Sequence, residues 1–370
     1  MAEIRIEHLH KSFGSFTAVR DSTFTVPDGS FFCLLGPSGC GKTTTLRMIA
    51  GLELPTAGRI LLGGADVTDK RASARDIAFV FQLFALYPHM NVRRNIAYPL
   101  VSTGVPRAEV RERVEEVGRI LRIGHLLDRS ISGLSGGDRQ RVALGRAIVR
   151  RPLAFLMDEP LGALDAEFRH LMCTELRTLH DRIKATTVYV THDQMEAMAL
   201  ADQIAVMNGG IVEQLDTPRN IYARPATVFV ASFIGSPAMN LLPTHDAVQP
   251  GRARLRLGGA EVAVPDPHEA LSARDLVLGV RPEHVRLGDA GALRGEVAGT
   301  EYLGSTQIVI VATAQGTVRA RLPASTRVDV GEQVGLSFAA DKLSVFDAGT
   351  GRAVRSALHE PVAVLEAAHG

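Results

Sequence analysis

The chain has 370 residues, 46% of them hydrophobic, which predicts two globular domains with buried cores. Its 41 basic and 40 acidic residues give a net charge of +1, which argues against nucleic acid as a ligand. Three cysteines favour a reducing compartment, and the apolar runs are too short to span a bilayer. The amino terminus starts with an alternating strand pattern, so we expect no signal peptide and a membrane role only through a partner.

Residues 1–235 alternate short apolar runs with helical patterns. Buried strands are predicted at residues 31–35, 77–81, 154–157 and 187–190. This alternation is typical of a mostly parallel sheet flanked by helices, an α/β fold. From about residue 88 to 152 the pattern becomes helical, as in 108–122, where apolar residues recur at helical spacing. We therefore predict a helical subdomain at about 88–152 within a first domain at 1–235.

Residues 236–370 have a different character, with short alternating runs separated by turn residues. The compact spacing of these runs predicts an all-β domain, built as a small barrel or sandwich. After about residue 348 the sequence shows no clear periodicity, apart from a possible short helix near 362–368, so we assign no structure there.

The sequence G-P-S-G-C-G-K-T at residues 36–43 follows the first strand and precedes a helical pattern. Such glycines let successive backbone N–H groups surround phosphate oxygens, while Lys42 adds a positive charge and the Thr43 hydroxyl can bind Mg²⁺. A purely structural turn is the alternative, but the flanking strand and helix favour a phosphate-binding loop. The expected nucleotide contacts are Ser38, Gly39, Cys40, Gly41, Lys42, Thr43 and Thr44, with Cys40 contributing its backbone N–H.

Two carboxylates follow the strand predicted at 154–157. Because α/β sheets bind ligands at the carboxyl ends of their strands, Asp158 is placed to hold Mg²⁺. Glu159 comes one residue later, and we predict that it is the general base for the water that attacks the γ-phosphate. Two acids that merely end a strand are the alternative.

Two further polar residues directly follow predicted strands. The amide of Gln82 could reach the metal or the attacking water, although a lone exposed glutamine often has no role. His192 can donate a hydrogen bond to a γ-phosphate oxygen, the alternative being a histidine that simply ends its strand. The predicted metal ligands are Thr43, Gln82 and Asp158, and the predicted catalytic residues are Glu159 and His192.

The sequence L-S-G-G-D at residues 134–138 precedes a helical pattern. Ser135, Gly136 and Gly137 form a helix start whose exposed N–H groups suit an anion. The chain thus has two anion-binding helix starts about a hundred residues apart. One explanation is that the helix start at residues 135–137 contacts the nucleotide bound to a neighbouring copy.

In order and spacing, these motifs and G-A-L-D at 162–165 resemble those of the ATP-binding subunits of ABC transporters. The likeness covers residues 1–235. It implies ATP hydrolysis and a head-to-tail homodimer that sandwiches two ATP molecules. Each ATP would lie between the phosphate loop of one copy and Ser135, Gly136 and Gly137 of the other.

The resemblance also draws attention to two single positions. Phe13 matches the aromatic residue that stacks on adenine in this family, and a core phenylalanine is the alternative. Asp138 departs from the family, in which glutamine is usual at this position. Because a carboxylate near a nucleotide is unfavourable, we expect Asp138 to make dimer closure weaker or slower without abolishing activity.

The second domain resembles the regulatory oligonucleotide-binding-fold domain of ATPases that serve bacterial sugar importers. The matching segments are residues 229–240, 279–284, 302–305 and 343–347. A carbohydrate or polyol derivative, as in glycerol-phosphate importers, is therefore the leading cargo. Polyamine, iron and thiamine importers have related domains and remain alternatives. This segment lacks interleaved aromatic and basic residues, which argues against a nucleic-acid role despite the fold.

The resemblance implies two transmembrane permease subunits as partners and, indirectly, an extracytoplasmic substrate-binding protein. The chain would then lie at the cytoplasmic face of the cell membrane, where ATP closes the dimer and hydrolysis resets it. A soluble ABC ATPase that acts on DNA or ribosomes is an alternative, but it would usually have two cassettes or a coiled coil. A non-catalytic ATP switch is another, and it requires Glu159 to be idle.

Overall fold

The computed structural model describes residues 2–81, 85–162 and 164–359, and the chain divides into two compact units, Met1–Pro218 and Arg219–Gly370. Gln82 and the possible helix at 362–368 lie outside the described residues. The predicted domain boundary after residue 235 stays a prediction. No helix in the described part of the chain has both the length and the apolar character needed to cross a membrane.

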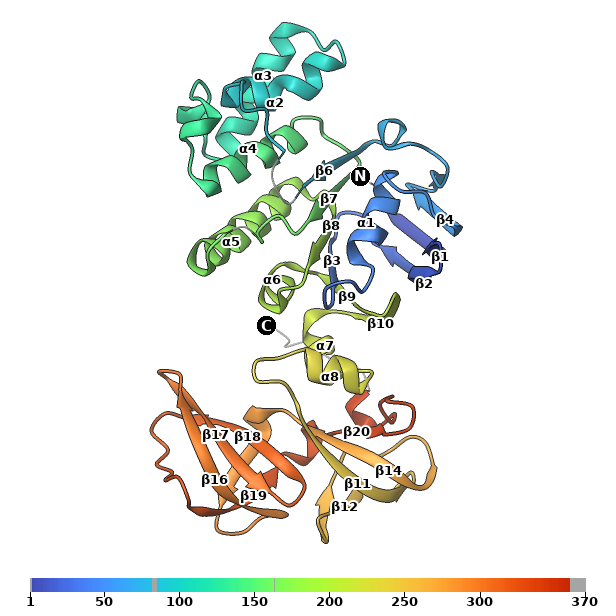
Figure 1. Cartoon of the computed structure of the whole chain (residues 1–370), viewed down its shortest axis with the longest axis vertical. Coiled ribbons are helices and arrows are strands. Elements are labelled where there is room, and N and C mark those ends of the chain that lie inside the picture. The colour runs from blue at the N-terminus through green and yellow to red at the C-terminus, as the bar shows by residue number, and fades with distance from the viewer. Residues whose placement is uncertain (1, 82–84, 163, 360–370) are drawn as a thin grey trace, which may run out of the picture. The chain divides into compact units, whose positions relative to one another are not determined.

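A six-stranded sheet forms the centre of the first unit (Figure 1). Its strands, in spatial order, are β10 (Ile211–Asp216), β9 (Gln203–Asn208), β3 (Phe31–Leu35), β8 (Thr186–Thr191), β7 (Ala154–Asp158) and β6 (Ile77–Val80). β10 is antiparallel to β9, and the other neighbouring strands are parallel. The four strands predicted from buried apolar runs are confirmed within one residue at each end. The carboxyl ends of β3, β6, β7 and β8 therefore meet at one edge of the sheet.

A second, antiparallel sheet packs against the first helix. In spatial order it contains β2 (Phe16–Val26), β1 (Ile4–Phe13), β4 (Ala57–Leu62) and β5 (Ala65–Asp66). α1 (Lys42–Ala50) lies between the two sheets, and its buried Leu46 and Ile49 share one apolar core with Ile6 and Leu34. This burial fixes the start of α1, where the phosphate-binding loop ends.

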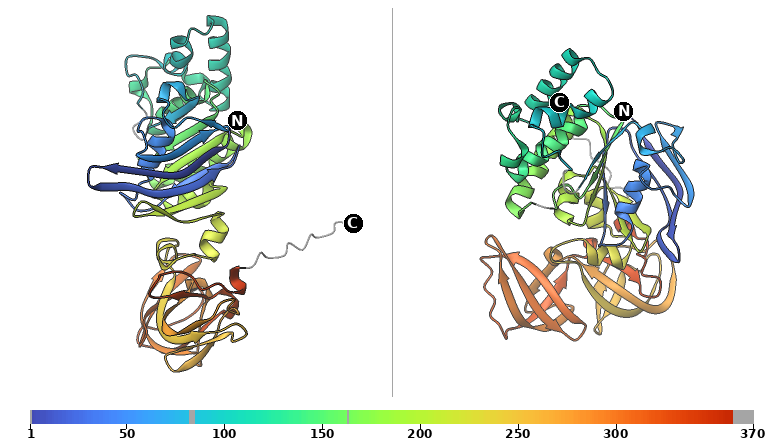
Figure 2. Two further views of the ribbon diagram at one scale, coloured as in Figure 1. Left: turned by 90° about the vertical axis from the view of Figure 1, so that its right-hand side faces the viewer. Right: turned by 45° about the horizontal axis from the view of Figure 1, so that its top comes forward.

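Three helices of the first unit come between β6 and β7. They are α2 (Val92–Ser102), α3 (Arg107–Ile120) and α4 (Gly136–Ile148), followed after β7 by α5 (Ala166–Ile183) and after β8 by α6 (Gln194–Leu200). α3 buries Val110, Val114 and Val117, as its periodicity predicts. Figures 1 and 2 both show α2, α3 and α4 gathered on the side away from the four-stranded sheet.

The second unit is mainly β structure. Its first helices are α7 (Pro218–Ala223), which begins at the boundary between the units, and α8 (Val228–Phe233). Its sheets have the spatial orders β11-β14-β20, β12-β13 and β15-β19-β16-β17-β18. The strand bounds are β11 (Asn240–Val248), β12 (Arg254–Leu257), β13 (Ala260–Ala263), β14 (Leu271–Val280), β15 (Val285–Gly288), β16 (Leu293–Tyr302), β17 (Thr306–Thr313), β18 (Gly316–Pro323), β19 (Gln333–Phe338) and β20 (Ser344–Asp347). All strand pairs here are antiparallel and surround one apolar core, so the predicted all-β character is confirmed (Figure 2).

A buried arginine ties the two short helices to this β structure. Arg281 follows β14 and is only 2% exposed. Its guanidinium donates to the carbonyl oxygens of Tyr222 (2.8 and 3.1 Å), Ala231 (3.3 Å) and Ile234, and it lies 4.1 Å from the centre of the Tyr222 ring. Arg281 thus satisfies carbonyls at the ends of α7 and α8 that would otherwise be buried without a donor.

Candidate functional site

The phosphate-binding loop leaves the carboxyl end of β3 and leads into α1. Gly41 has a φ of +102°, and a Cβ there would lie 2.4 Å from the Ala18 carbonyl oxygen, so only glycine fits. The buried ammonium of Lys42 donates to the carbonyl oxygens of Gly36 (2.8 Å) and Pro37 (2.9 Å). Lys42 is therefore held within its own loop, beside the backbone N–H groups expected to meet phosphate.

The other predicted loop residues differ in accessibility. Ser38 and Gly39 are exposed at the tip of the loop, and Thr44 is half-buried in the first turn of α1. The Cys40 side chain is buried, and this burial raises the pKa of its thiol. A buried, protonated thiol is a poor nucleophile, which is consistent with the backbone role predicted for Cys40.

Thr43 and Asp158 meet across the sheet edge. The Thr43 hydroxyl donates a 3.0 Å hydrogen bond to Oδ1 of Asp158, although 115 residues separate them. Burial raises the pKa of the Asp158 carboxyl, and the Thr43 hydrogen bond partly offsets this effect. A hydroxyl and a carboxylate oxygen are ligands that Mg²⁺ accepts, together with substrate phosphates. The two side chains therefore suit a metal that also contacts nucleotide, which is the site predicted for them.

Glu159 and His192 also lie side by side. Nδ1 of His192 is 3.2 Å from Oε1 of Glu159, with the histidine 54% and the glutamate 22% exposed. Glu159 has a φ of +43°, a conformation that residues with a β-carbon rarely adopt, and its N–H donates to the Val190 carbonyl oxygen at 3.0 Å. This turn holds the carboxylate at the end of β7 facing the histidine after β8. Strained backbone of this kind is enriched at functional sites.

Phe13 stands at the end of β1 and is not a core residue. Its side chain is 48% exposed, and the ammonium of Lys11 lies 4.7 Å from the centre of its ring. An exposed aromatic face is available for stacking, so the adenine contact stays a prediction. The contacts predicted for Gln82 cannot be described, because this residue is outside the described part of the chain.

The second anion-ready helix start is the amino terminus of α4, capped by Ser135. The Ser135 hydroxyl accepts from the Asp138 N–H (3.2 Å) and donates to Oδ2 of Asp138 (2.7 Å). Asp138 also pairs with Arg141 (3.3 Å), which binds Glu175 through two further hydrogen bonds (2.9 and 3.1 Å). The single proton of the Ser135 hydroxyl is therefore already donated to Asp138, the residue that departs from the family pattern.

Within the described part of one chain, no hydrogen bond joins Ser135 to the phosphate-binding loop. The structure thus brings together Lys42, Thr43, Asp158, Glu159 and His192, but it does not bring Ser135 to them. A second copy remains the predicted partner for Ser135.

Arg169 on α5 was not among the predicted residues. Its guanidinium donates to the Leu164 carbonyl oxygen (2.9 Å) and to Oδ2 of Asp193 (2.9 Å), and its Nε lies 3.5 Å from Glu196. Arg169 therefore joins the loop after Glu159 to the residue after His192. No pattern signals this role, because arginine on a helix is usually a solvated surface residue.

Comparison with known proteins gives matches to both units. Residues 19–162 match the family model of the ABC transporter, residues 235–285 that of the MalK OB fold domain, and residues 278–346 that of the TOBE domain. The chain is 47% identical to the sn-glycerol-3-phosphate import ATP-binding protein UgpC of Cereibacter sphaeroides, over 95% of this chain and 99% of that protein. The chain belongs to the ATP-binding subunits of ABC transporters.

Two further proteins of the family illustrate its range. The chain is 46% identical to the trehalose/maltose import ATP-binding protein MalK of Thermococcus litoralis, over 96% of this chain and all of that protein. The solved structure of cbiO1 from Clostridium perfringens, part of the ABC transporter complex cbiONQ, matches with a TM-score of 0.56 and 25% identity. That match covers 60% of this chain and 90% of cbiO1.

Family membership confirms the main expectations from the sequence. The chain is an ABC transporter ATPase subunit that binds nucleotide and works with membrane permease subunits. An ABC ATPase domain followed by an oligonucleotide-binding-fold domain is confirmed as its architecture.

Proposed function

We propose that this chain hydrolyses ATP to power import of a carbohydrate or polyol derivative through a membrane ABC transporter. The observation that carries the proposal is the convergence of Thr43, Asp158, Glu159 and His192 at one sheet edge beside Lys42. We keep residues 1–235 as the nucleotide-binding domain and 236–370 as the regulatory domain.

The phosphates of ATP would bind over the start of α1. There backbone N–H groups between Ser38 and Thr44 would donate to the phosphates, and Lys42 would exchange its contacts with loop carbonyls for contacts with phosphate oxygens. Phe13 would stack on adenine. Thr43, Asp158 and Gln82 would hold Mg²⁺, which would neutralise phosphate charge and orient the γ-phosphate when bound.

Glu159 would act as the general base for hydrolysis. Its carboxylate follows Asp158 directly at the end of β7, so it could accept a proton from a water that attacks the γ-phosphate. His192, 3.2 Å away, would orient this carboxylate and donate to a γ-phosphate oxygen as charge develops. A non-catalytic switch would not need this pair.

Two copies would associate head to tail, so that Ser135, Gly136 and Gly137 of one copy complete the site of the other. The absence of a hydrogen bond between Ser135 and the phosphate-binding loop within the described residues of one chain supports this arrangement. The dimer would lie at the cytoplasmic face of the membrane on two permease subunits. An extracytoplasmic substrate-binding protein would deliver the cargo.

The cargo assignment rests on the relatives. UgpC is named for sn-glycerol-3-phosphate import, MalK for trehalose/maltose, and SugC of Mycobacterium tuberculosis, 44% identical over 95% of this chain and 98% of that protein, for trehalose. All three cargoes are sugars or polyol derivatives. We therefore place this class ahead of polyamines, iron and thiamine.

The test is ATP hydrolysis by the complex purified from membranes, with and without binding protein loaded with trehalose, maltose or glycerol 3-phosphate. The variant Glu159→Gln serves as the inactive control. Stimulation by one of these cargoes would support the proposal and identify the substrate. Turnover that no sugar or polyol alters, but that a polyamine stimulates, would contradict the cargo assignment.

A further inference from the structure

A cleft between α5 and the helices α3 and α4 has no part in the nucleotide site. It contains a cavity of about 250 Å³ whose floor is formed by leucines, among them Leu121, Leu144, Leu176 and Leu179. An adjoining cavity of about 420 Å³ shares Ile120 and Arg182 with the first. Volumes of this order are typical of small-molecule sites.

The cleft is strongly basic, although the chain as a whole is almost neutral. Five arginines line the two cavities, against two glutamates, and Glu109 pairs with one of these arginines from outside the lining, so two positive charges remain in excess. Three of the arginines are already paired: Arg141 with Glu175, Arg151 with Glu116, and Arg113 with Glu109.

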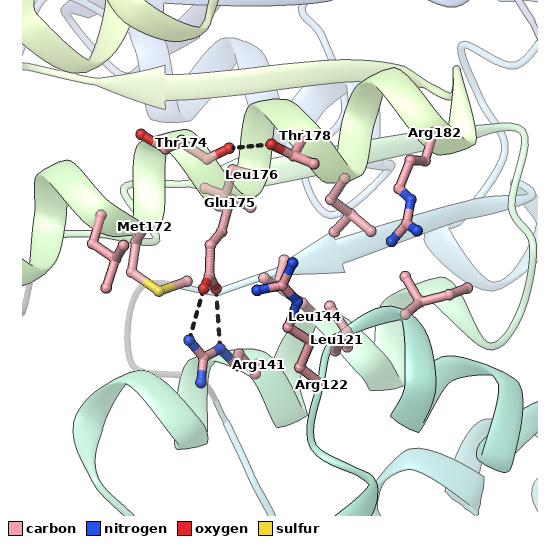
Figure 3. Close-up of a pocket in the computed structure, with 13 residues that line it drawn as sticks. Leu121, Arg122, Arg141, Leu144, Met172, Thr174, Glu175, Leu176, Thr178 and Arg182 are labelled. Carbon is pink, nitrogen blue, oxygen red and sulfur yellow. Dashed lines mark hydrogen bonds and ion pairs between the residues drawn. The ribbon is translucent and has the colours of Figure 1, made fainter.

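The remaining two arginines, Arg122 and Arg182, have no hydrogen-bonded or ion-paired partner for their guanidinium groups among the described residues. Figure 3 shows that they enter the same opening from opposite sides, Arg182 from α5 and Arg122 from the turn after α3. Arg122 has a φ of +57°, a conformation that glycine or asparagine would adopt at lower cost. This conformation ends α3, where the Arg122 N–H donates to the Arg119 carbonyl oxygen (3.2 Å) and the Ile123 N–H donates to that of Gly118 (2.9 Å). Both arginines are exposed, so an anion can reach their guanidinium groups from solvent.

We propose that this cleft binds a small amphipathic anion, with a carboxylate or phosphate head and a short apolar body. The head would accept charge-assisted hydrogen bonds from Arg122 and Arg182, whose planar guanidinium groups suit two-oxygen anions. The body would cover Leu121, Leu144 and Leu179. A neutral ligand of the same shape would leave both positive charges unpaired.

The cleft is connected to the loop expected to contact ATP. Arg141 lines the first cavity and binds Glu175 there (Figure 3), and it also pairs with Asp138, which accepts the Ser135 hydroxyl proton. An anion near Arg141 competes with Asp138 for its guanidinium. We therefore expect occupancy of the cleft to change the rate of ATP hydrolysis, a consequence that rests on the proposed function.

Isothermal titration calorimetry of the purified full chain measures binding to the cleft independently of ATP hydrolysis. The probes are octanoate and octyl phosphate, with octanol and inorganic phosphate as the neutral and head-only controls. We expect both octyl anions to bind at least tenfold more tightly than either control. The stronger of the two identifies the head group as carboxylate or phosphate.

Variants locate the binding. Arg122→Gln and Arg182→Gln should each weaken binding about tenfold, since each removes charge-assisted hydrogen bonds. Arg119→Gln is the matched control, because Arg119 is an exposed arginine of α3 that does not line the cleft, and it should leave binding unchanged. Octanol binding as tightly as octanoate, equal losses in Arg119→Gln and Arg122→Gln, or no binding of either anion would each overturn the proposal.

The connection to Ser135 has its own test. Octyl phosphate should alter ATP hydrolysis by the wild-type chain and leave the Arg122→Gln/Arg182→Gln variant unaffected. The same change in both proteins, or binding without any change in hydrolysis, would refute the connection. If the isolated chain shows no ATP hydrolysis, the same comparison is made with the complex purified from membranes. Absence of hydrolysis there would refute the proposed function, while the calorimetric result still decides the binding site.

Discussion

Replacing Asp138 with glutamine should tighten the ATP-dependent dimer. In the structure the only proton of the Ser135 hydroxyl is donated to Oδ2 of Asp138 at 2.7 Å. If Ser135 donates to the γ-phosphate of the ATP bound to a second copy, its hydrogen bond to Asp138 must break first. The Asp138 carboxylate must also approach the negatively charged phosphate, which is unfavourable. Glutamine lacks the charge, and Arg141 keeps Glu175 as a partner in the variant.

The magnitude follows from the exposure of the pair. Hydrogen bonds to charged groups contribute about 1.5–3 kcal/mol. Ser135 is exposed and the Asp138 side chain is 26% exposed, so solvent reduces the contribution to about 1 kcal/mol. A symmetric dimer contains two such serines and therefore gains about 2 kcal/mol, which corresponds to a dissociation constant about thirtyfold lower.

The assay is sedimentation equilibrium with ATP and Mg²⁺, in a Glu159→Gln background that keeps ATP intact. A double-mutant cycle with Ser135→Ala separates the hydroxyl effect from general charge repulsion. If Asp138 acts through Ser135, Asp138→Gln should give its full gain only when the serine is present. An equal gain in the Ser135→Ala background, or no gain at all, would refute the reasoning.

Three further predictions follow from single side chains. Glu159→Gln should lower ATP turnover at least about a hundredfold while ATP binding persists. Steady-state hydrolysis measures the turnover, and equilibrium binding of a labelled nucleotide measures the affinity. Turnover close to that of the wild type would exclude Glu159 as the base. Arg281→Gln should lower the free energy of unfolding of the second unit by about 3 kcal/mol, because carbonyls such as that of Tyr222 lose their donor. Calorimetry of the full chain should then show a lower unfolding temperature for this unit. An unchanged unfolding temperature would contradict the capping role. Burial raises the pKa of Glu196 above its ordinary 4.5, so the wild type should lose stability as pH rises from about 4.5 through the folded-state pKa. Glu196→Gln should remove that loss, which urea unfolding at several pH values would reveal; an identical pH profile in both proteins would show that Glu196 is not responsible.

The sheet and its loops were predictable because their signals are local. Buried parallel strands appear as short apolar runs, and the residues directly after them must lie at the sheet edge. For this reason the sequence alone places Thr43, Asp158, Glu159 and His192 at the same sheet edge. In the structure Thr43 contacts Asp158, and Glu159 contacts His192. The glycines of the phosphate-binding loop are predictable from the sequence for a similar reason, because a backbone curled around an anion needs left-handed conformations.

The arginines were not predictable in the same way. Arg75 is 2% exposed and donates to the carbonyl oxygens of Met48 and Ile49 at the end of α1, more than twenty residues earlier in the chain. Arg281 does the same for α7 and α8. Carbonyl acceptors are present at every residue and carry no sequence signature, so a buried arginine with such partners looks like any surface arginine until the chain is folded.

The same argument explains why the links between the loops of the site emerge only from the structure. Arg169 binds the Leu164 carbonyl and Asp193 with one rigid, planar guanidinium, so a displacement of the loop after Glu159 strains the contact with the residue after His192. Glu159 and His192 are thus held by segments that cannot shift independently without breaking a charged hydrogen bond.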